Sequence, residues 1–285
     1  MPSLIDIRRR IRSVKNTQQI TKAMKMVAAA RLRKAQDRVI AARPYARMLS
    51  ETLRNISAAV AEDETINNHP LLAVREENRI ALILVTSDRG FAGGFNGNLI
   101  KAAQEFIAQH PNQVTLELRG RKGRDYFRRR NFPTSGELTG VSEAPKWEHA
   151  LSLSETMMER FANEEVDAVY VLFNEFRSVL SQRVTLKKVL PVAVSAGENP
   201  PDYIFEQPPA EMMRILLPRY VALEIFHAFL ESAASEHAAR MTAMDAATSN
   251  AAEVIDKLTL HMNRVRQASI TKEIIEVVSG AAALE

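Results

Sequence analysis

The sequence predicts a mixed α/β and α+β fold, in which a Rossmann-like α/β domain is inserted into a long antiparallel coiled coil formed by the N- and C-terminal helices. Apolar residues recur at alternating spacings of three and four near both ends of the chain, which is the pattern of a coiled-coil seam. Between these ends, strand-like and helix-like segments alternate. We therefore expect three parts: an N-terminal coiled-coil helix over 1–61, an α/β domain over 62–208 and a C-terminal coiled-coil helix over 209–285.

The N-terminal seam runs from Leu4 to Val60, and fourteen of its seventeen positions are apolar residues including alanine. Its polar interruption consists of Gln18, Thr21 and Lys25. A continuous helix of this length would measure roughly 85 Å, at 1.5 Å per residue. We expect such a helix to project from a domain of this size and to need a partner helix.

The partner is expected at the other end of the chain, where a second seam runs from Leu230 to Val265. Two long seams in one chain are best buried against each other, whereas the alternative is two separate helices on a globular core. Ser3 is placed to cap the first helix, and Pro209 suits the first turn of the last one. Two internal prolines are expected to disturb these helices: Pro44 should bend or break the first, and Pro218 should kink the last.

The middle of the chain has the pattern of a small α/β domain with a largely parallel sheet. The run IALILVT is continuously apolar and rich in β-branched residues, as in a strand buried on both faces. We expect strands at 80–86, 114–118, 168–174 and 184–190, and helices up to about 109, at 122–130 and at 145–163.

Composition excludes several classes of function. The 285-residue chain contains no cysteine, so it has neither disulfides nor thiolate metal sites, and its longest apolar run is far too short to span a membrane. We see no signal or transit peptide and expect a soluble protein on the cytosolic side of a bacterium. The six histidines lack metal-ligand spacing, and no nucleophile has a visible base. We therefore expect no catalytic residue, metal site or cofactor.

Positive charge is concentrated near the N-terminus: Arg8 to Arg38 contains eleven lysines and arginines but a single acid, Asp37. This basic stretch has three interpretations. It could be a solvated face that pairs with the acidic C-terminal helix, or a collar for an acidic partner surface. Nucleic-acid binding is the third and is least favoured, because aromatic residues for base stacking are absent here.

A glycine-rich segment, SDRGFAGGFNGN, follows the first expected strand and precedes a helix, which is where α/β folds often bind phosphate. Its glycine spacing matches neither dinucleotide-binding nor P-loop patterns, and Asp88 would repel a phosphate. We favour a tight structural or protein-contact loop and keep a nucleotide site as the alternative.

The final segment differs from the preceding seam, because from Ile274 onward apolar residues surround the helix on all sides. Such a pattern usually means burial on every side. A chain end cannot achieve this in a two-helix rod, so we expect a socket made by other chains. The alternative is a frayed tail.

Three stretches together resemble the gamma subunit of F-type ATP synthase: IRRRIRSVKNTQQITKAMKMVAAARLRKAQ, SDRGFAGGFN and RQASITKEIIEVVSGAAAL. The resemblance implies a rotor shaft without an active site, which couples proton flow to ATP synthesis or hydrolysis. It implies as partners three alpha and three beta chains, an epsilon chain and the c-ring, with no nucleic acid and no small-molecule substrate. It also implies a peripheral location on the cytoplasmic side of the bacterial inner membrane, held there through the complex.

The resemblance further implies which residues contact partners. Arg266 and Gln267 match positions at the catch loop of the beta chain, with Thr271 and Glu273 near them. Contact with the lever of the beta chain is implied for Met24, Lys25, Arg8, Arg9 and Arg240, and contact through the glycine loop for Asp88, Arg89, Gly93 and Gly94. The alternative function is a nucleotide-binding α/β protein whose coiled coil acts as an adaptor.

Overall fold

The computed structural model describes residues 3–59, 69–193 and 207–282. By contacts the chain divides into two compact units, Met1–Ala28 with Met241–Glu285, and Ala29–Arg240, which are described separately below. The three-part division of the sequence stays a prediction. The elements are α1 (Leu4–Ala59), the 3₁₀ turn η1 (Pro70–Leu72), β1 (Ile80–Val85), α3 (Phe95–Gln109), β2 (Val114–Arg119), α4 (Arg121–Arg128), β3 (Thr134–Leu138), α5 (Trp147–Ala162), β4 (Ala168–Phe176), β5 (Gln182–Leu190) and α6 (Pro209–Ala282).

The unit Ala29–Arg240 contains a five-stranded sheet with the order β3-β2-β1-β4-β5. β1 lies at its centre and pairs in parallel with both β2 and β4, so that Ile83 lies opposite Glu117 on one side and Val171 on the other. β3 is also parallel, whereas β5 returns antiparallel to β4. The predicted Rossmann-like, largely parallel sheet is therefore confirmed.

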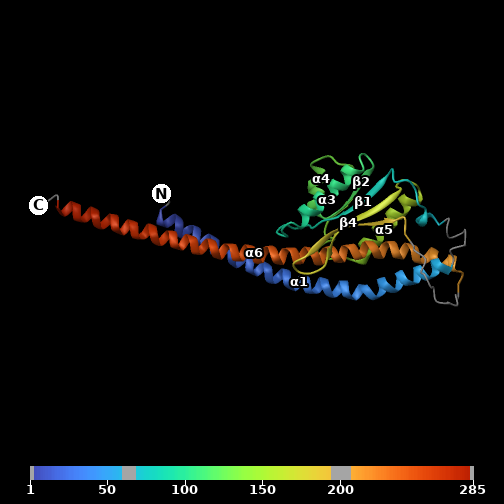
Figure 1. The fold of residues 1–285 in the computed structure, drawn as a ribbon, viewed down its shortest axis with the longest axis horizontal. Coiled ribbons are helices and arrows are strands. Elements are labelled where there is room, and N and C mark those ends of the chain that lie inside the picture. Colours follow the sequence, from blue (N-terminus) through green and yellow to red (C-terminus); the bar gives the residue numbers. More distant parts are fainter. Residues whose placement is uncertain (1–2, 60–68, 194–206, 283–285) are drawn as a thin grey trace. The chain divides into compact units, whose positions relative to one another are not determined.

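Helices cover both faces of this sheet (Figure 1). On one face, Ile80, Leu82 and Leu84 pack in a core that includes residues of α3 and α4. On the other face, Ala81 and Ile83 pack in a second core with residues of α5, α6 and the end of α1. Every residue of β1 is buried because the strand is covered on both sides, which explains its continuous apolar sequence.

In α1 the predicted seam is the buried face. Every seam position from Leu4 to Ile56 is buried or half-buried, and Ile7, Leu32 and Ile56 are at most 4% exposed. Ser3 caps the helix with a reciprocal pair of bonds: its hydroxyl accepts from the backbone N–H of Asp6, whose carboxylate accepts from the backbone N–H of Ser3.

Neither internal proline ends its helix: α1 continues through Pro44 and α6 through Pro218. A break at Pro44 is therefore not found. An interior proline costs about 3 kcal/mol. The burial of Leu49, Leu53 and Ile56 beyond it supplies apolar packing that offsets this cost.

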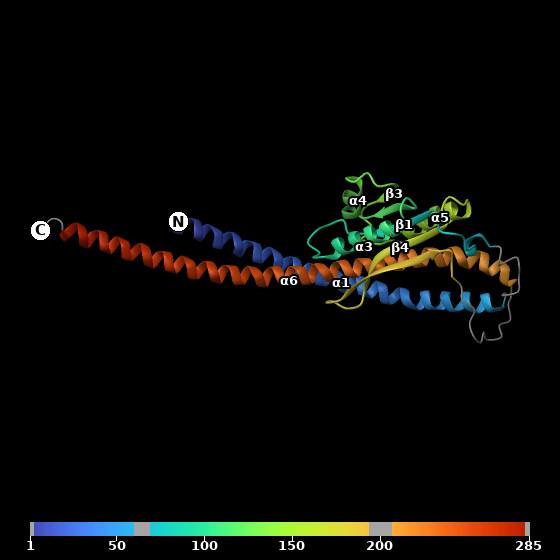
Figure 2. The ribbon, with the colours of Figure 1, turned by 45° about the horizontal axis from the view of Figure 1, so that its top comes forward.

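In the unit Met1–Ala28 with Met241–Glu285, α1 and α6 form an antiparallel pair (Figure 2). The hydroxyls of Thr21 and Thr248 lie 2.8 Å apart, and the ammonium group of Lys25 contacts the carboxylate of Asp245. Counting residues along both helices from these contacts places Leu4 opposite about residue 265, because antiparallel helices advance at the same rise. The two predicted seams are thus each other's partners, and the second seam ends where α1 begins.

β3 is a strand that the sequence pattern does not reveal. Four of its five residues are exposed, and its sequence TSGEL has no apolar alternation. Gly136 allows the strand to approach β2, since a side chain there would place its Cβ 2.3 Å from the carboxylate of Glu117. Pairing at an open sheet edge therefore decides this element.

Candidate partner-binding surfaces

The structure shows no candidate metal centre: within its described ranges, no three His, Asp or Glu side chains gather as ligands could. No described helix is long and apolar enough to cross a membrane. The residues singled out by the sequence belong instead to three surfaces: the basic face of α1, the end of α6 and the glycine loop.

The basic face of α1 is largely unpaired. Among the described residues, Lys25 and Arg31 alone of the eleven cations between Arg8 and Arg38 form ion pairs, with Asp245 and Glu143 respectively. Pairing with the acidic C-terminal helix therefore accounts for one contact. The remaining cations are available to another molecule: Arg8, Arg9, Arg10, Arg12, Lys15, Lys22, Arg33, Lys34 and Arg38.

The polar interruption of the seam is a cross-helix contact. Thr21 is 8% exposed and meets Thr248, while Lys25 and Asp245 pair beside it with side chains 40% and 56% exposed. Met24 is half-buried. Polar pairs at seam positions fix the register of two helices, since sliding would leave each group unpaired. Two members of the interruption thus have partners within the chain.

Four of the predicted contact residues lie on α6 beyond the end of the helix pair. Arg266, Gln267, Thr271 and Glu273 are all exposed. The hydroxyl of Thr271 donates to the carbonyl of Gln267 at 3.0 Å, and that of Ser269 donates to the carboxylate of Glu273 at 3.2 Å. The side chains of Arg266 and Gln267 have no partner in the described parts of the chain.

The helix that follows is apolar and uncovered. Ile274 and Ile275 are 57% and 59% exposed, and Val277 and Val278 are 72% and 61% exposed. An isolated apolar residue at a surface needs no explanation, but a contiguous band of them marks a surface for another molecule. The described part of this segment is a helix, so the structure gives a regular element where fraying was the alternative.

The glycine loop is held by its own chain through Asp88. One carboxylate oxygen of Asp88 accepts from the backbone N–H of Arg121 at 3.0 Å, at the start of α4. The other accepts from the N–H of Gly140 at 2.9 Å and the hydroxyl of Ser142 at 3.1 Å. Asp88 therefore takes up one backbone N–H at the start of α4 and places a negative charge within the loop. This geometry favours the structural or protein-contact interpretation.

The outer part of the loop is exposed. Phe91 is 72% exposed and adopts a left-handed backbone with φ of 61°, which is unusual for a bulky residue. Gly93 shares this conformation with φ of 55°, and Gly94 caps α3. Arg89 pairs with Glu143 at 3.3 Å. The structure thus separates an anchoring residue, Asp88, from side chains that face outward.

Arg240 is committed to contacts within the chain. Its guanidinium pairs with the carboxylate of Glu236, and their side chains are 11% and 5% exposed. It also donates to the carbonyl of Gly90 at 3.4 Å and to Nδ1 of His237 at 3.3 Å. Burial raises the pKa of Glu236, against the opposing effect of Arg240. Arg240 therefore ties α6 to the glycine loop, and its predicted contact with a partner stays a prediction.

Sequence reasoning did not identify Glu236, Ser142 or Glu143, although one signal was available. Glu236 and Arg240 are four residues apart on a helix, which is the spacing of an ion pair. Ser142 and Glu143 lie in a connection with no distinctive pattern, so their proximity to Asp88 and Arg31 depends on the fold.

Comparisons with known proteins agree with this architecture. The family model described as ATP synthase matches residues 3–284. A protein of Solibacter usitatus named ATP synthase gamma chain is 66% identical over 286 residues, covering all of both chains. The protein of the same name from Desulfitobacterium hafniense is 50% identical over 285 residues, again covering both chains fully.

Solved structures share the fold at low sequence identity. A chain of the Euglena gracilis mitochondrial ATP synthase (OSCP/F1/c-ring, rotational state 3) aligns with a TM-score of 0.69 and 17% identity, covering 99% of this chain and 94% of that one. A chain from the central stalk and c-ring of the Tetrahymena thermophila enzyme aligns at 0.59 with 22% identity, covering 80% and 99%.

Proposed function

The chain belongs to the ATP synthase family, with gamma chains as close relatives, and we propose that it is the central-stalk rotor subunit of a proton-translocating F-type ATP synthase. In this role it transmits torque between a membrane c-ring and a catalytic ring of three alpha and three beta chains. It has no active site of its own and takes part in catalysis as a subunit.

One observation carries this proposal: α6 continues past the beginning of α1 and presents a helix that no described part of its own chain covers. Residues 270–279 are exposed throughout. An apolar helix needs a surrounding apolar surface. A sleeve formed by other chains satisfies this need, and a contact with few directional hydrogen bonds suits a part that turns.

The predicted contact residues then divide by location. Arg266, Gln267, Thr271 and Glu273 lie on the uncovered part of α6, and we assign them to the catch loop of a beta chain. Arg8, Arg9 and the basic face around Met24 and Lys25 are assigned to the acidic lever of a beta chain, because their charges are mostly unpaired. The exposed edge of the glycine loop, with Arg89, Gly93 and Gly94, is assigned to a further subunit contact, which Asp88 and Arg240 position.

The division into 1–61, 62–208 and 209–285 also enters the proposal. The two helical parts form the shaft, and the α/β part lies at its foot against the epsilon chain and the c-ring. The chain is held at the cytoplasmic face of the bacterial inner membrane through these partners, with neither nucleic acid nor a small-molecule substrate.

Reconstitution tests the proposal directly. The full chain is mixed with the alpha and beta chains of the same ATP synthase, and the assembly is purified by size. We expect one complex containing all three chains, with ATP hydrolysis in the complex and none by this chain alone. ATP hydrolysis by the purified chain, or failure to enter the complex, would overturn the proposal.

The second candidate, a nucleotide-binding adaptor, makes a different prediction. It requires ATP, ADP or NAD to bind at residues 87–97, which calorimetry on the full chain would detect. We expect no such binding, because the carboxylate of Asp88 lies within this loop, anchored by Arg121 and Gly140, and would repel a phosphate.

A further inference from the structure

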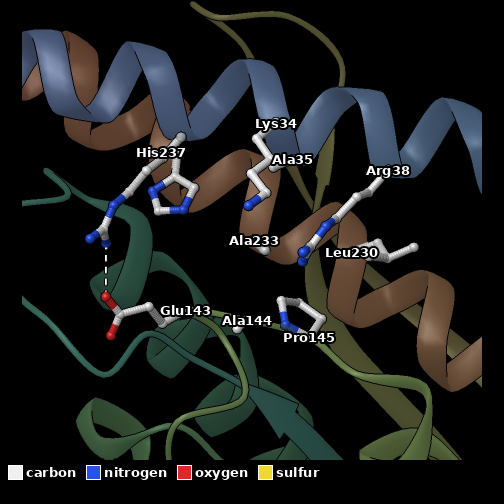
Figure 3. Close-up of a pocket in the computed structure, with 10 residues that line it drawn as sticks. Lys34, Ala35, Arg38, Glu143, Ala144, Pro145, Leu230, Ala233 and His237 are labelled. Carbon is white, nitrogen blue, oxygen red and sulfur yellow. Dashed lines mark hydrogen bonds and ion pairs between the residues drawn. The ribbon is translucent and has the colours of Figure 1, made fainter.

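A small cavity in the unit Ala29–Arg240 has no role in the function proposed above. Its volume is about 220 Å³, and it is lined by α1, by α6 and by residues 143–145, which precede α5. Figure 3 shows Lys34 and Arg38 directed from α1 toward the side that carries Glu143 and Pro145. The cavity therefore lies between elements from three distant parts of the sequence.

Positive charge in this cavity exceeds the negative charge available to balance it. Arg31, Lys34 and Arg38 follow each other at spacings of three and four, so they share one face of α1. Among the described residues that line the cavity, Glu143 is the only acidic one. Its carboxylate is shared by two arginines, Arg31 at 2.9 Å and Arg89 at 3.3 Å. Lys34 and Arg38 have no acidic partner in the parts of the chain that the structure describes.

His237 completes the polar lining and is 5% exposed. Arg240 has only hydrogen-bond donors, so the 3.3 Å contact between its guanidinium and Nδ1 of His237 makes Nδ1 the acceptor. Burial, with Arg240 and Arg31, lowers the pKa of His237 to about 4. At neutral pH the ring is uncharged, and its proton lies on Nε2 as a donor.

We propose that this cavity binds a small oxyanion of the size of phosphate, held by Lys34 and Arg38 with Arg31 and His237 beside them. The planar fork of an arginine matches two oxygens of such an anion, and the lysine adds a mobile point charge. The ligand is a bound effector and not a substrate. This proposal is independent of the rotor assignment.

The size and lining of the cavity favour a small anion over an acidic protein segment. Drug-sized ligands occupy cavities of about 300–1,000 Å³, so a volume of about 220 Å³ suits something smaller. The remaining walls come from Ala35, Ala144, Pro145, Leu230 and Ala233, whose side chains offer no hydrogen bonds to a peptide backbone.

Titration of the full chain with inorganic phosphate at constant, low ionic strength tests the proposal. We expect saturable binding with a dissociation constant on the order of 1 mM, because the cations remain partly solvated. Sulfate should compete with phosphate. ADP should compete weakly or not at all, since its base and ribose exceed the cavity.

A matched pair of double variants locates the site. Lys34→Gln/Arg38→Gln should weaken phosphate binding at least tenfold. The control Arg33→Gln/Arg43→Gln removes two cations from α1 outside the cavity and should change the affinity less than twofold. Far-UV circular dichroism verifies that both variants fold.

Three outcomes would overturn the proposal. Phosphate binding that does not saturate, or an equal loss in both double variants, would mean non-specific attraction to a basic helix. Tighter binding of hexaglutamate, lost in the Lys34→Gln/Arg38→Gln variant and not displaced by phosphate, would assign the cavity to a protein carboxylate. ADP binding through the same residues in preference to phosphate would contradict the size argument.

Discussion

Two stretches of α6 both combine apolar and charged residues but have opposite environments. Every residue from 228 to 239 is buried, including Glu231, Glu236 and His237. Every residue from 270 to 279 is exposed, including three isoleucines and two valines. In the first stretch, Glu231 accepts from the backbone N–H of Phe176, Ser235 donates to the carbonyl of Asn174 and Glu236 pairs with Arg240. In the second, Lys272 pairs with Glu276 and Thr271 donates to the carbonyl of Gln267, while the apolar side chains remain exposed. The same helix therefore forms part of the structural core in one stretch and exposes an apolar surface in another.

The largest effect is expected from removing Arg240, the cation that directly follows the buried stretch. Arg240→Ala leaves the buried carboxylate of Glu236 without its partner, and we expect the free energy of unfolding to fall by about 3–5 kcal/mol. Urea unfolding of the full chain, followed by far-UV circular dichroism, measures this. The double variant Glu236→Gln/Arg240→Gln removes both charges and should recover much of the loss. A single variant as stable as the wild type would show that the pair does not anchor this stretch.

The second largest effect concerns pH and again separates the buried stretch from the exposed one. The pKa of His237 is lowered to about 4, chiefly by burial and then by Arg240 and Arg31, whereas Glu143 raises it. As the pH falls, His237 is therefore protonated in the unfolded chain at a higher pH than in the folded chain. We expect the free energy of unfolding to fall as the pH is lowered from about 6.5 to about 4, by about 3 kcal/mol at most.

The variant His237→Gln isolates this contribution in urea unfolding at several pH values. Glu236 acts in the opposite direction, because its raised pKa makes the folded state bind a proton more readily as the pH falls. It is present in both proteins, so the difference between their pH profiles reports on His237. Parallel profiles from pH 4 to 7 would refute the assignment.

A smaller effect is expected where α1 and α6 pair, at the partly buried contact between Thr21 and Thr248. Thr21→Val leaves the hydroxyl of Thr248 without its cross-helix contact, although that hydroxyl still donates to the carbonyl of Met244. We expect a loss of about 1 kcal/mol for the single change and almost none for Thr21→Val/Thr248→Val. Thermal unfolding of the three proteins measures the difference. An equally destabilised double variant would mean that the hydroxyls do not act as a pair.

The smallest effect on stability is expected at Arg266, which lies four residues before the exposed stretch. Arg266→Ala should change the free energy of unfolding by no more than about 0.5 kcal/mol, because the side chain has no described partner. In the reconstituted ATP synthase, however, the same variant should pump fewer protons per ATP hydrolysed. Unchanged pumping would remove Arg266 from the proposed contact with the catch loop. A large loss of stability would contradict the comparison of the two stretches.

The periodicity of the sequence determined the seam of α1, the second seam up to Val265 and the buried central strand. Each of these depends on apolar residues repeating at a period that one regular element imposes. The glycine-rich motif located the glycine loop, and apolar residues on all sides of the helix marked the unusual end of α6. The exposed edge strand β3 escaped this reasoning because it has almost no buried face.

Only the tertiary structure decided which polar residues face inward. In the sequence, Arg240 and Arg266 look like equivalent cations on one helix. In the structure, Arg240 is enclosed by Glu236, His237 and Gly90, whereas Arg266 is exposed. Likewise, the interruption at Thr21 and Lys25 looks like a defect until Thr248 and Asp245 lie opposite it. Periodicity reports which face of an element is apolar. The partner of a polar group is set by contacts between residues far apart in the chain, which a local pattern does not contain.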